Sequence, residues 1–302
     1  MYGQKAKVSL PAHPDEITCI PAEKRVFIFW QCSKGKNVPG YISLCLETFV
    51  KFNPDIHIMF LNYENIVPLI GNMVDMKRLE RVSFAQQSDI LIPCFLLKYG
   101  GTFLDADMIY TGAIDWINQY DAQTLVGFGR PKIDINWAIL SAREPNNFIL
   151  FHIHEMQRYK LSHLPVEALG KQLWSFFGNS ISRNVVKFLG DSKQIAVVPN
   201  TTFILEGFFG FRKDDIPNWV AYMEFWFRGN YISANDMISC PLYNIIALHN
   251  SWTPQDVKDM SASDFIKQNC PLAQLFRTLL DCDEIDEKQL LKVPFTEKHT
   301  LS

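Results

Sequence analysis

Two short apolar runs, rich in β-branched and aromatic residues, enclose a helical pattern near the start of the chain. The runs cover residues 25–30 and 56–61. Between them, apolar residues recur at the spacing of one face of an amphipathic helix, namely Ile42, Cys45, Leu46, Phe49 and Val50. A strand, a helix and a second strand with short connections are typical of a βαβ unit. The chain is therefore predicted to form an α/β domain around a parallel sheet.

A second helix is predicted between Ser83, a favourable N-cap, and the Gly100-Gly101 pair, which ends it. Pro93 lies inside this helix and removes one hydrogen bond, so a kink or a restart is expected near Ile92. Further elements are predicted by the same patterns: strands at 102–107, 136–140, 194–198 and 243–248, and a helix at 147–159.

The length of the chain, and the change to helical patterns with little strand signal after residue 252, favour one α/β domain over residues 1–252 and a helical C-terminal appendage over residues 253–302. Thr253 and Pro254 suit the N-cap and the first helical position of the appendage. The amphipathic segment 271–280 is expected to pack on the main domain, with peripheral contact at the inner membrane surface as the alternative.

The charge and the cysteines limit the class of protein. The chain has 29 basic and 32 acidic residues and a net charge of -3, which argues against a protein that binds nucleic acid. No apolar run reaches the roughly 18 residues of a membrane span, and the first residues show no secretion signal. The seven cysteines show no paired spacing, which favours reduced thiols. We therefore expect a cytoplasmic protein.

The segment that says most about the chemistry of the protein ends in two aspartates, Asp105 and Asp107. Successive strand residues point to opposite faces, so both carboxylates are expected on one face. Such a pair repels unless a cation lies between the two groups, and oxygen ligands suit Mg²⁺ or Mn²⁺. Without side chains, Gly100-Gly101 lets a nucleotide or a neighbouring strand approach the backbone. Alone, the two aspartates could equally be a solvated strand end.

The wider pattern is more specific than the two aspartates. The segment Lys98-Tyr-Gly-Gly-Thr-Phe-Leu-Asp-Ala-Asp107, with Ser88-Asp89 upstream, resembles the D-x-D region of glycosyltransferases with the GT-A fold. It is similar to glycosyltransferase family 32, to bacterial capsular polysaccharide transferases and to the large clostridial glucosylating toxins. The resemblance implies a nucleotide-sugar-binding, Rossmann-like mixed sheet flanked by helices.

The resemblance also implies roles for the acidic residues. Asp105 would contact the ribose and the donor sugar, often meeting the metal through water, and Asp107 would bind Mn²⁺ or Mg²⁺ directly. Asp89 would hold hydroxyl groups of the transferred sugar. Gly101 belongs to the same donor-binding motif. In the family, an Arg commonly follows three residues after the position of Asp89, but here it is Ile92, which leaves galactose or glucose open as the donor hexose.

Two other segments match the family less tightly. Late in family members, a short segment closes over the diphosphate, and His249, Asn250, Ser251 and Trp252 are similar to it. Either His249 or Asn250 would be the third metal ligand, and Trp252 would donate to a phosphate. The first strand would end at the base, with Trp30 stacking on uracil and Gln31 beside it.

Each of these assignments has a simpler alternative. Trp30 could be a core residue, His249 a satisfied buried histidine and Asp89 an exposed helix residue. Asn136 falls where the fold reaches the acceptor and the β-face of the sugar, which makes it a catalytic candidate; the alternative is a turn residue. His152 and His154 do not share a helix face and are interpreted as structural.

Taken together, the resemblance implies a metal-dependent retaining glycosyltransferase. It would move a hexose from a UDP-sugar to a hydroxyl group of a capsular or lipopolysaccharide intermediate, with a lipid-linked oligosaccharide as acceptor. One alternative is a phosphohydrolase of the haloacid dehalogenase type, although its D-x-D motif normally ends the first strand. Another is a sugar-nucleotide-binding module with a degenerate site.

Overall fold

The computed structural model describes residues 7–32, 37–130, 134–158, 176–189, 194–199, 217–229, 232–288 and 290–291. A seven-stranded sheet has the order β1-β3-β2-β4-β7-β6-β8. Its strands are β1 (Lys7–Ser9), β2 (Arg25–Phe29), β3 (His57–Leu61), β4 (Gly101–Leu104), β6 (Leu125–Arg130), β7 (Asp134–Ala142) and β8 (Ile195–Pro199). Strand β7 runs antiparallel to β4 and β6, and the remaining pairs are parallel. A separate antiparallel ladder joins β5 (Met108–Tyr110) and β9 (Ile245–Ala247).

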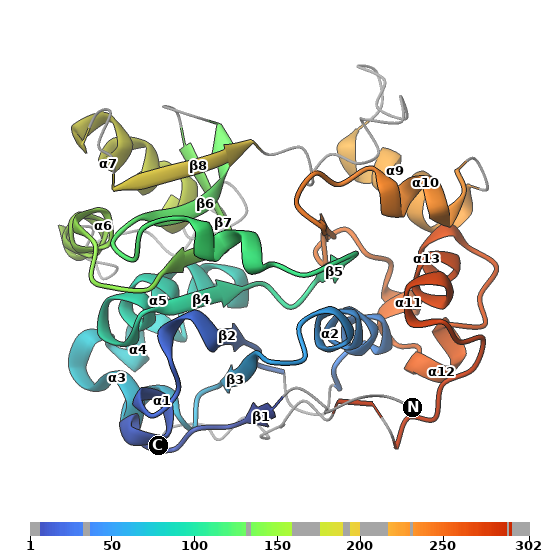
Figure 1. Ribbon diagram of the computed structural model, residues 1–302, viewed down its shortest axis with the longest axis horizontal. Coiled ribbons are helices and arrows are strands. Elements are labelled where there is room, and N and C mark those ends of the chain that lie inside the picture. Colours follow the sequence, from blue (N-terminus) through green and yellow to red (C-terminus); the bar gives the residue numbers. More distant parts are fainter. Residues whose placement is uncertain are drawn as a thin grey trace.

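Helices cover the sheet on both sides (Figure 1). In chain order they are α1 (Pro14–Thr18), α2 (Gly40–Phe52), α3 (Ile66–Ile70), α4 (Met76–Leu79), α5 (Phe84–Tyr99), α6 (Asn147–Arg158), α7 (Ile181–Leu189), α9 (Asn218–Met223), α10 (Ala234–Ser239), α11 (Gln255–Lys258), α12 (Ala262–Phe265) and α13 (Pro271–Leu280). Short 3₁₀ segments lie at Ala22–Lys24, Gly71–Met73 and Asp115–Gln119, and π-helical turns lie at Phe176–Ser180 and Glu224–Arg228.

Two cores result from the alternation of side chains along the strands. Val26 and Ile28 of β2 face the core that contains α2, whereas Phe27 and Phe29 face the core that contains α5. Successive strand residues point to opposite faces, so one strand contributes to both cores. The predicted α/β class, a mixed sheet flanked by helices, is confirmed.

Most predicted elements are present, with shifted ends. Ser83 caps α5, accepting a hydrogen bond from the backbone N–H of Gln86 while the Gln86 side chain bonds back. The helix continues through Pro93 without the expected restart. Strand β4 ends at Leu104, so the two aspartates follow the strand instead of lying within it. Strands β1, β5 and β6 were not predicted.

The C-terminal helices pack against α2. The backbone N–H of Gly40 donates to the carbonyl of Met260 at 3.1 Å, and the Tyr41 and Phe265 rings lie 6.3 Å apart. The apolar face of α13 is buried in the same core as α2, which supports packing over membrane contact for segment 271–280. Helix α11 begins one position later than predicted, with Pro254 as its N-cap. Within the described residues, no helix has the length and apolar character needed to cross a bilayer.

Truncation of a buried leucine in α13 tests this packing. Leu275 is fully buried, whereas Leu242 is 73% exposed. Leu275→Ala should lower the free energy of unfolding by about 2–5 kcal/mol because it leaves a cavity. Leu242→Ala should change it by no more than about 0.5 kcal/mol. Urea unfolding followed by circular dichroism measures both, and equal stability of the two variants would contradict the packing of α13.

Candidate functional site

A pocket of about 350 Å³ lies where β2 and β4 end and β7 begins. Parallel strands β2 and β4 end at the same edge of the sheet. Strand β7 is antiparallel to β4, so its first residues lie at that edge too. The pocket is lined by Phe29, Trp30, Gln31, Phe84, Ala85, Ser88, Asp89, Asp105, Ala106, Asp107, Met108, Asn136, Trp137, Ala138, Leu248, His249, Asn250 and Ser251.

Backbone pairing fixes the two aspartates in this pocket. The backbone N–H of Asp105 donates to the carbonyl of Ala138 at 2.8 Å, which extends the β4–β7 ladder by one residue. The carbonyl of Asp107 accepts from the N–H of Leu248 at 2.9 Å, next to the β5–β9 ladder. The D-x-D segment therefore spans the gap between the two sheets, and each aspartate is held by a different one.

The carboxyl groups in the pocket disfavour ionisation. Burial raises the pKa of Asp105 well above its ordinary value, and the charges of Asp107 and Asp89 raise it further. Burial raises the pKa of Asp107 to about 6, although the N–H of Asn250 donates to its Oδ2 at 2.9 Å and opposes the shift. Among the described residues that line the pocket there is no Lys or Arg. Three acids thus share a pocket whose described lining has no Lys or Arg, and the charge of Lys258, outside that lining, lowers the pKa of Asp107 only in part.

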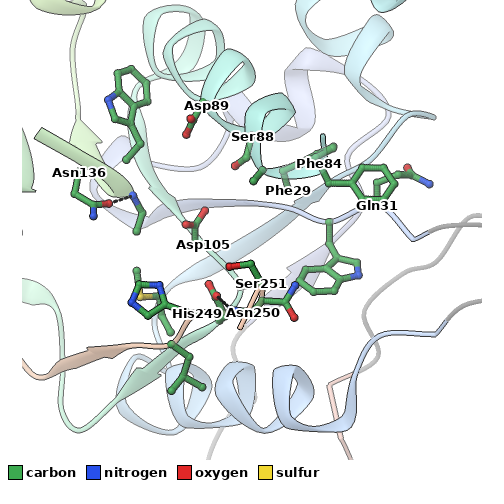
Figure 2. Close-up of a pocket in the computed structure, with 18 residues that line it drawn as sticks. Phe29, Gln31, Phe84, Ser88, Asp89, Asp105, Asn136, His249, Asn250 and Ser251 are labelled. Atoms are coloured by element: carbon green, nitrogen blue, oxygen red, sulfur yellow. Dashed lines mark hydrogen bonds between the residues drawn. The ribbon is translucent and has the colours of Figure 1, made fainter. Parts of the chain in front are cut away.

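Asp89, on helix α5, lies across the pocket from Asp105 (Figure 2). Burial raises its pKa to about 8, and a hydrogen bond from the backbone of Gly178 only partly opposes the shift. A Cβ atom on Gly178 would lie 2.9 Å from the Asp89 Oδ2 and 2.9 Å from the Trp137 ring. Glycine at this position therefore lets the π-helical turn approach the carboxyl group closely.

The segment 249–253 is held by two buried tyrosines. Tyr41 of α2 donates its hydroxyl to the Asn250 Oδ1. Tyr222 of α9 accepts from the backbone N–H of His249 at 3.3 Å, and its hydroxyl lies 3.1 Å from the Thr253 hydroxyl. Both tyrosines are fully buried. The segment is therefore tied to two helices that lie far apart in the sequence.

Most of the predicted site residues meet in the pocket. Trp30, Gln31, Asp89, Asp105, Asp107, Asn136, His249, Asn250 and Ser251 all line it. Figure 2 shows Gln31 and Phe84 at one end, His249 and Asn136 at the other, and Asp105 between them. The Asn136 Oδ1 accepts from the N–H of Ala138 at 2.9 Å, which orients its amide. The described pocket thus brings residues from five segments together.

Two predicted donor-binding residues do not line the pocket. Gly101 starts β4, at the opposite end of that strand, where a Cβ atom would lie 2.9 Å from the Arg25 Cβ. The absence of a side chain at Gly101 lets the neighbouring strand β2 approach closely. This is the second of the two roles that the sequence allows for Gly100-Gly101, the first being close approach of a nucleotide. Trp252 lies behind His249, with ring centroids 4.1 Å apart. It supports the His249 ring and is not among the residues that line the pocket.

The predicted metal ligands are only partly assembled. In the described portion of the chain, no three His, Cys, Asp or Glu side chains are arranged to hold a metal ion. Asp105 and Asp107 lie together, but His249 does not complete a three-residue ligand set with them. The Asn250 amide, the other candidate, is engaged by Tyr41.

Sequence reasoning missed several residues of the pocket. Phe29 and Phe84 give it aromatic surface, and Trp137 forms part of its wall. Trp137 is backed by His152, which is fully buried, with ring centroids 4.1 Å apart. Burial lowers the pKa of His152 to about 3, so the ring stays neutral. For Phe84, the only signal in the sequence that could have pointed to the pocket was its position directly after the Ser83 N-cap.

Comparison with known proteins identifies the family. The profile of the family described as "Capsular polysaccharide synthesis protein" matches residues 11–161, half of the chain. The chain therefore belongs to this family, which confirms the resemblance to capsular polysaccharide transferases. The match includes β2, α5, β4, the D-x-D segment and β7, and thus most of the pocket. A search of curated proteins finds no match.

Three solved glycosyltransferase structures show a distant likeness. PaToxG glycosyltransferase is 15% identical over 56% of this chain and 70% of its own, with a TM-score of 0.38. An active-site mutant of LgtC is 11% identical over 89% and 97%, with a TM-score of 0.39. GlyE of Streptococcus pneumoniae TIGR4 is 12% identical over 87% and 61%, with a TM-score of 0.36. These likenesses are too distant to support an inference about the site.

The raised pKa of Asp89 predicts a pH-dependent stability. Between the pKa of an unfolded aspartate, about 4, and the folded value of about 8, the folded chain holds a proton that the unfolded chain has released. Stability therefore falls as pH rises through this window. Asp89→Asn removes the penalty and should raise the free energy of unfolding at pH 7 by up to about 4 kcal/mol.

The gain should shrink towards pH 4, because the unfolded wild-type chain then begins to take up the proton that the folded chain already holds. Urea unfolding at several pH values measures it. Asp121→Asn, at an exposed aspartate outside the pocket, is the matched control and should show no such trend. A stabilisation by Asp89→Asn that is the same at pH 4 and pH 7 would contradict the titration of Asp89.

Proposed function

We propose that the chain is a metal-dependent retaining glycosyltransferase. It moves a hexose, galactose or glucose, from a UDP-sugar to a hydroxyl group of a capsular or lipopolysaccharide intermediate. The observation that carries the proposal is the group of three acids in a pocket whose described lining has no Lys or Arg. Membership in a capsular polysaccharide synthesis family agrees with it, because polysaccharide synthesis requires sugar transfer.

The donor set fits a hard divalent cation. Mg²⁺ is usually bound by one or two carboxylates together with substrate phosphates and water, so a cage of three protein ligands is not required. Asp107 and Asp105 would hold the ion, with His249 or Asn250 as the further candidate. When bound, Mn²⁺ or Mg²⁺ supplies positive charge that neutralises the departing diphosphate. Its charge would also lower the pKa values that burial and mutual repulsion raise.

The other residues orient the substrates. Asp89, protonated or hydrogen-bonded, faces the pocket where hydroxyl groups of the sugar would lie. Asn136 lies at the end away from Gln31, with its amide oriented by Ala138, and would meet the acceptor side of the sugar. Retention of configuration is supported by the resemblance of the D-x-D segment. The expected route is departure of UDP with same-face attack by the acceptor hydroxyl, whose proton passes to the diphosphate.

The acceptor and the place of action belong to the same proposal. A lipid-linked oligosaccharide acceptor would be met at the inner face of the membrane, so the protein would act in the cytoplasm or peripherally at that face. The structure gives less support to the phosphohydrolase alternative, since Asp105 follows β4 and not the first strand.

Release of UDP from several donors tests the function. UDP-galactose, UDP-glucose and their N-acetyl forms are incubated with the full chain, with and without Mn²⁺. Metal-dependent release of UDP from one hexose donor is expected. Release of phosphate from a phosphosugar would favour the phosphohydrolase, and donor binding without turnover would favour the degenerate binding module. Either outcome would overturn the proposal.

Asp107→Asn should reduce kcat at least about 100-fold, the scale for removing one group that stabilises charge in the transition state. The amide oxygen can still accept the hydrogen bond from Asn250, so the fold should be kept. Asp121→Asn is again the control and should retain full activity. A wild-type rate for Asp107→Asn would show that this carboxylate does not bind the ion.

The role of His249 as the third metal ligand can be tested by measuring metal binding and nucleoside binding separately. His249→Ala should weaken Mn²⁺ binding by more than it weakens binding of uridine alone, as measured by calorimetry. His154→Ala is the matched control because His154 is exposed on α6, away from the pocket. Equal losses of metal and uridine affinity would assign His249 a packing role against Trp252.

A further inference from the structure

A second pocket, of about 250 Å³, is lined by residues of α4, α5 and α6, which lie together in Figure 1. We call it the α4–α6 pocket. Its buried lining residues are all apolar, namely Leu79, Ile90, Cys94 and Phe177. Its exposed lining residues are all polar, namely Asn72, Asp75, Arg78 and Gln157. The pocket therefore has an apolar interior and a polar rim.

This division limits the kind of ligand that the α4–α6 pocket can take. Among its described lining residues the one cation is Arg78, whose Nε lies 3.2 Å from the Asp75 Oδ2. A small anion would have to compete with that carboxylate, so it is disfavoured. The half-buried Met73 and Met156 line the interior, and methionine adapts its shape to an irregular apolar partner. The pocket thus suits a flexible alkyl or isoprenoid chain.

Exposed apolar side chains lie beside the pocket on the same helix. Leu150 of α6 is 47% exposed and precedes Ile153, which lines the pocket, by three residues, so the two lie on one side of the helix. The Phe151 ring packs edge-on against Phe188 of α7, which is 72% exposed. Helix α7 carries two basic and no acidic residues. Apolar and basic side chains together are typical of a surface that contacts a membrane, where ligands with long apolar chains are found.

The α4–α6 pocket shares a wall with the pocket of the D-x-D segment. Ile90 lines the first pocket, and the preceding residue, Asp89, lines the second. Phe177 lines the first pocket, and the following residue, Gly178, hydrogen-bonds to Asp89. Consecutive Cα atoms are only about 3.8 Å apart. One layer of chain therefore separates the two pockets.

The shared wall lies at the acceptor end of the D-x-D pocket. A Cβ atom on Gly178 would lie 2.9 Å from the Trp137 ring. Trp137 directly follows Asn136, and both line the D-x-D pocket. Asn136 lies at the end away from Gln31 (Figure 2), where the proposed function places the acceptor. A single acceptor molecule with a sugar head and an apolar chain can therefore contact both pockets.

We propose that the α4–α6 pocket binds the apolar chain of the lipid-linked acceptor. The chain enters from the membrane beside Leu150 and lies against Ile153 and Met156, while the sugar hydroxyl that attacks the donor lies at the Asn136 end of the D-x-D pocket. Each methylene group that leaves water should raise the affinity about fourfold. This inference rests on the proposed function, since it needs a sugar acceptor.

Butyl and octyl β-glucoside test the chain site, because they share a sugar head and differ only in the length of the chain. Both are used below the concentration at which octyl glucoside forms micelles. Calorimetry with the full chain and no donor measures binding independently of turnover. The wild-type chain should bind octyl glucoside at least about tenfold more tightly than butyl glucoside.

Three variants place this preference in the α4–α6 pocket. Met156→Gln makes the lining polar at nearly constant volume, whereas Met156→Leu keeps it apolar. Leu150→Gln is the matched control, because it makes the same change on the same helix outside the lining. Met156→Gln should lose roughly five- to tenfold in affinity for octyl glucoside and little for butyl glucoside. Met156→Leu and Leu150→Gln should bind both glucosides as the wild type does.

Turnover links the chain site to the acceptor. With a UDP-hexose and Mn²⁺, the KM for the glucoside as acceptor should be lower for the octyl than for the butyl compound, and kcat should be the same for both. Met156→Gln should raise the KM for octyl glucoside and leave the KM for butyl glucoside unchanged.

Equal binding of the two glucosides by the wild-type chain would overturn the chain site and leave the proposed function standing. Equal losses in Met156→Gln and Leu150→Gln would also overturn it, because they would place the chain on the outer surface of α6. Tighter binding of octyl glucoside with a KM that is independent of chain length would assign the pocket to a membrane lipid and overturn its role for the acceptor. Failure to release UDP from any donor would overturn the proposed function, and the acceptor role with it.

Discussion

Burial of neighbouring carboxyl groups beyond the end of β4 is the constraint on which the site depends. Asp105 and Asp107 are placed by backbone hydrogen bonds to Ala138 and Leu248, so neither can move away without disrupting a strand ladder. Asp89 adds a third acid from α5. A fold that holds like charges this firmly loses stability unless a proton or a cation neutralises them. The arrangement therefore costs free energy in the unliganded state, and this cost is what a bound cation would relieve under the proposed function.

The small β5–β9 ladder connects this constraint to the C-terminal third of the chain. It pairs Met108 with Ala247, and so brings residues 249–251 next to the D-x-D segment. Tyr41 and Tyr222 then hold the same segment from α2 and α9. The C-terminal helices pack on α2, so their burial also stabilises the element that carries Tyr41. Packing far from the pocket thus positions one of its walls.

The sequence predicted those parts of the fold and the site that depend on local patterns. Helix α5 followed from its N-cap, its apolar periodicity and the glycines after it, and the aspartates followed from the D-x-D motif. The position of Gly101 away from the pocket could not be predicted, because its glycine character suits either a nucleotide or the side chain of Arg25 on the neighbouring strand. The place of Trp252 outside the pocket lining could not be predicted either, because only the structure shows its contact with the His249 ring. Phe84 gave no periodic signal, since a residue at the first helical position belongs to no apolar stripe.

The two chemical ends of the pocket result from one property of the sheet. Strands β2 and β4 are parallel neighbours, so the residues just beyond their ends lie side by side at one edge. An aromatic and an amide, Trp30 and Gln31, come directly after β2, and a pair of acids comes after β4. The pairing of β2 with β4 therefore sets aromatic surface beside negative charge, and helix α5 adds both Phe84 and Asp89 to the opposite wall. A ligand that joins a flat ring to phosphates through a short linker can satisfy both ends at once, whereas a simple sugar phosphate would leave the aromatic end exposed to water. The sheet edge thus supports the proposed nucleotide-linked donor over a free phosphosugar.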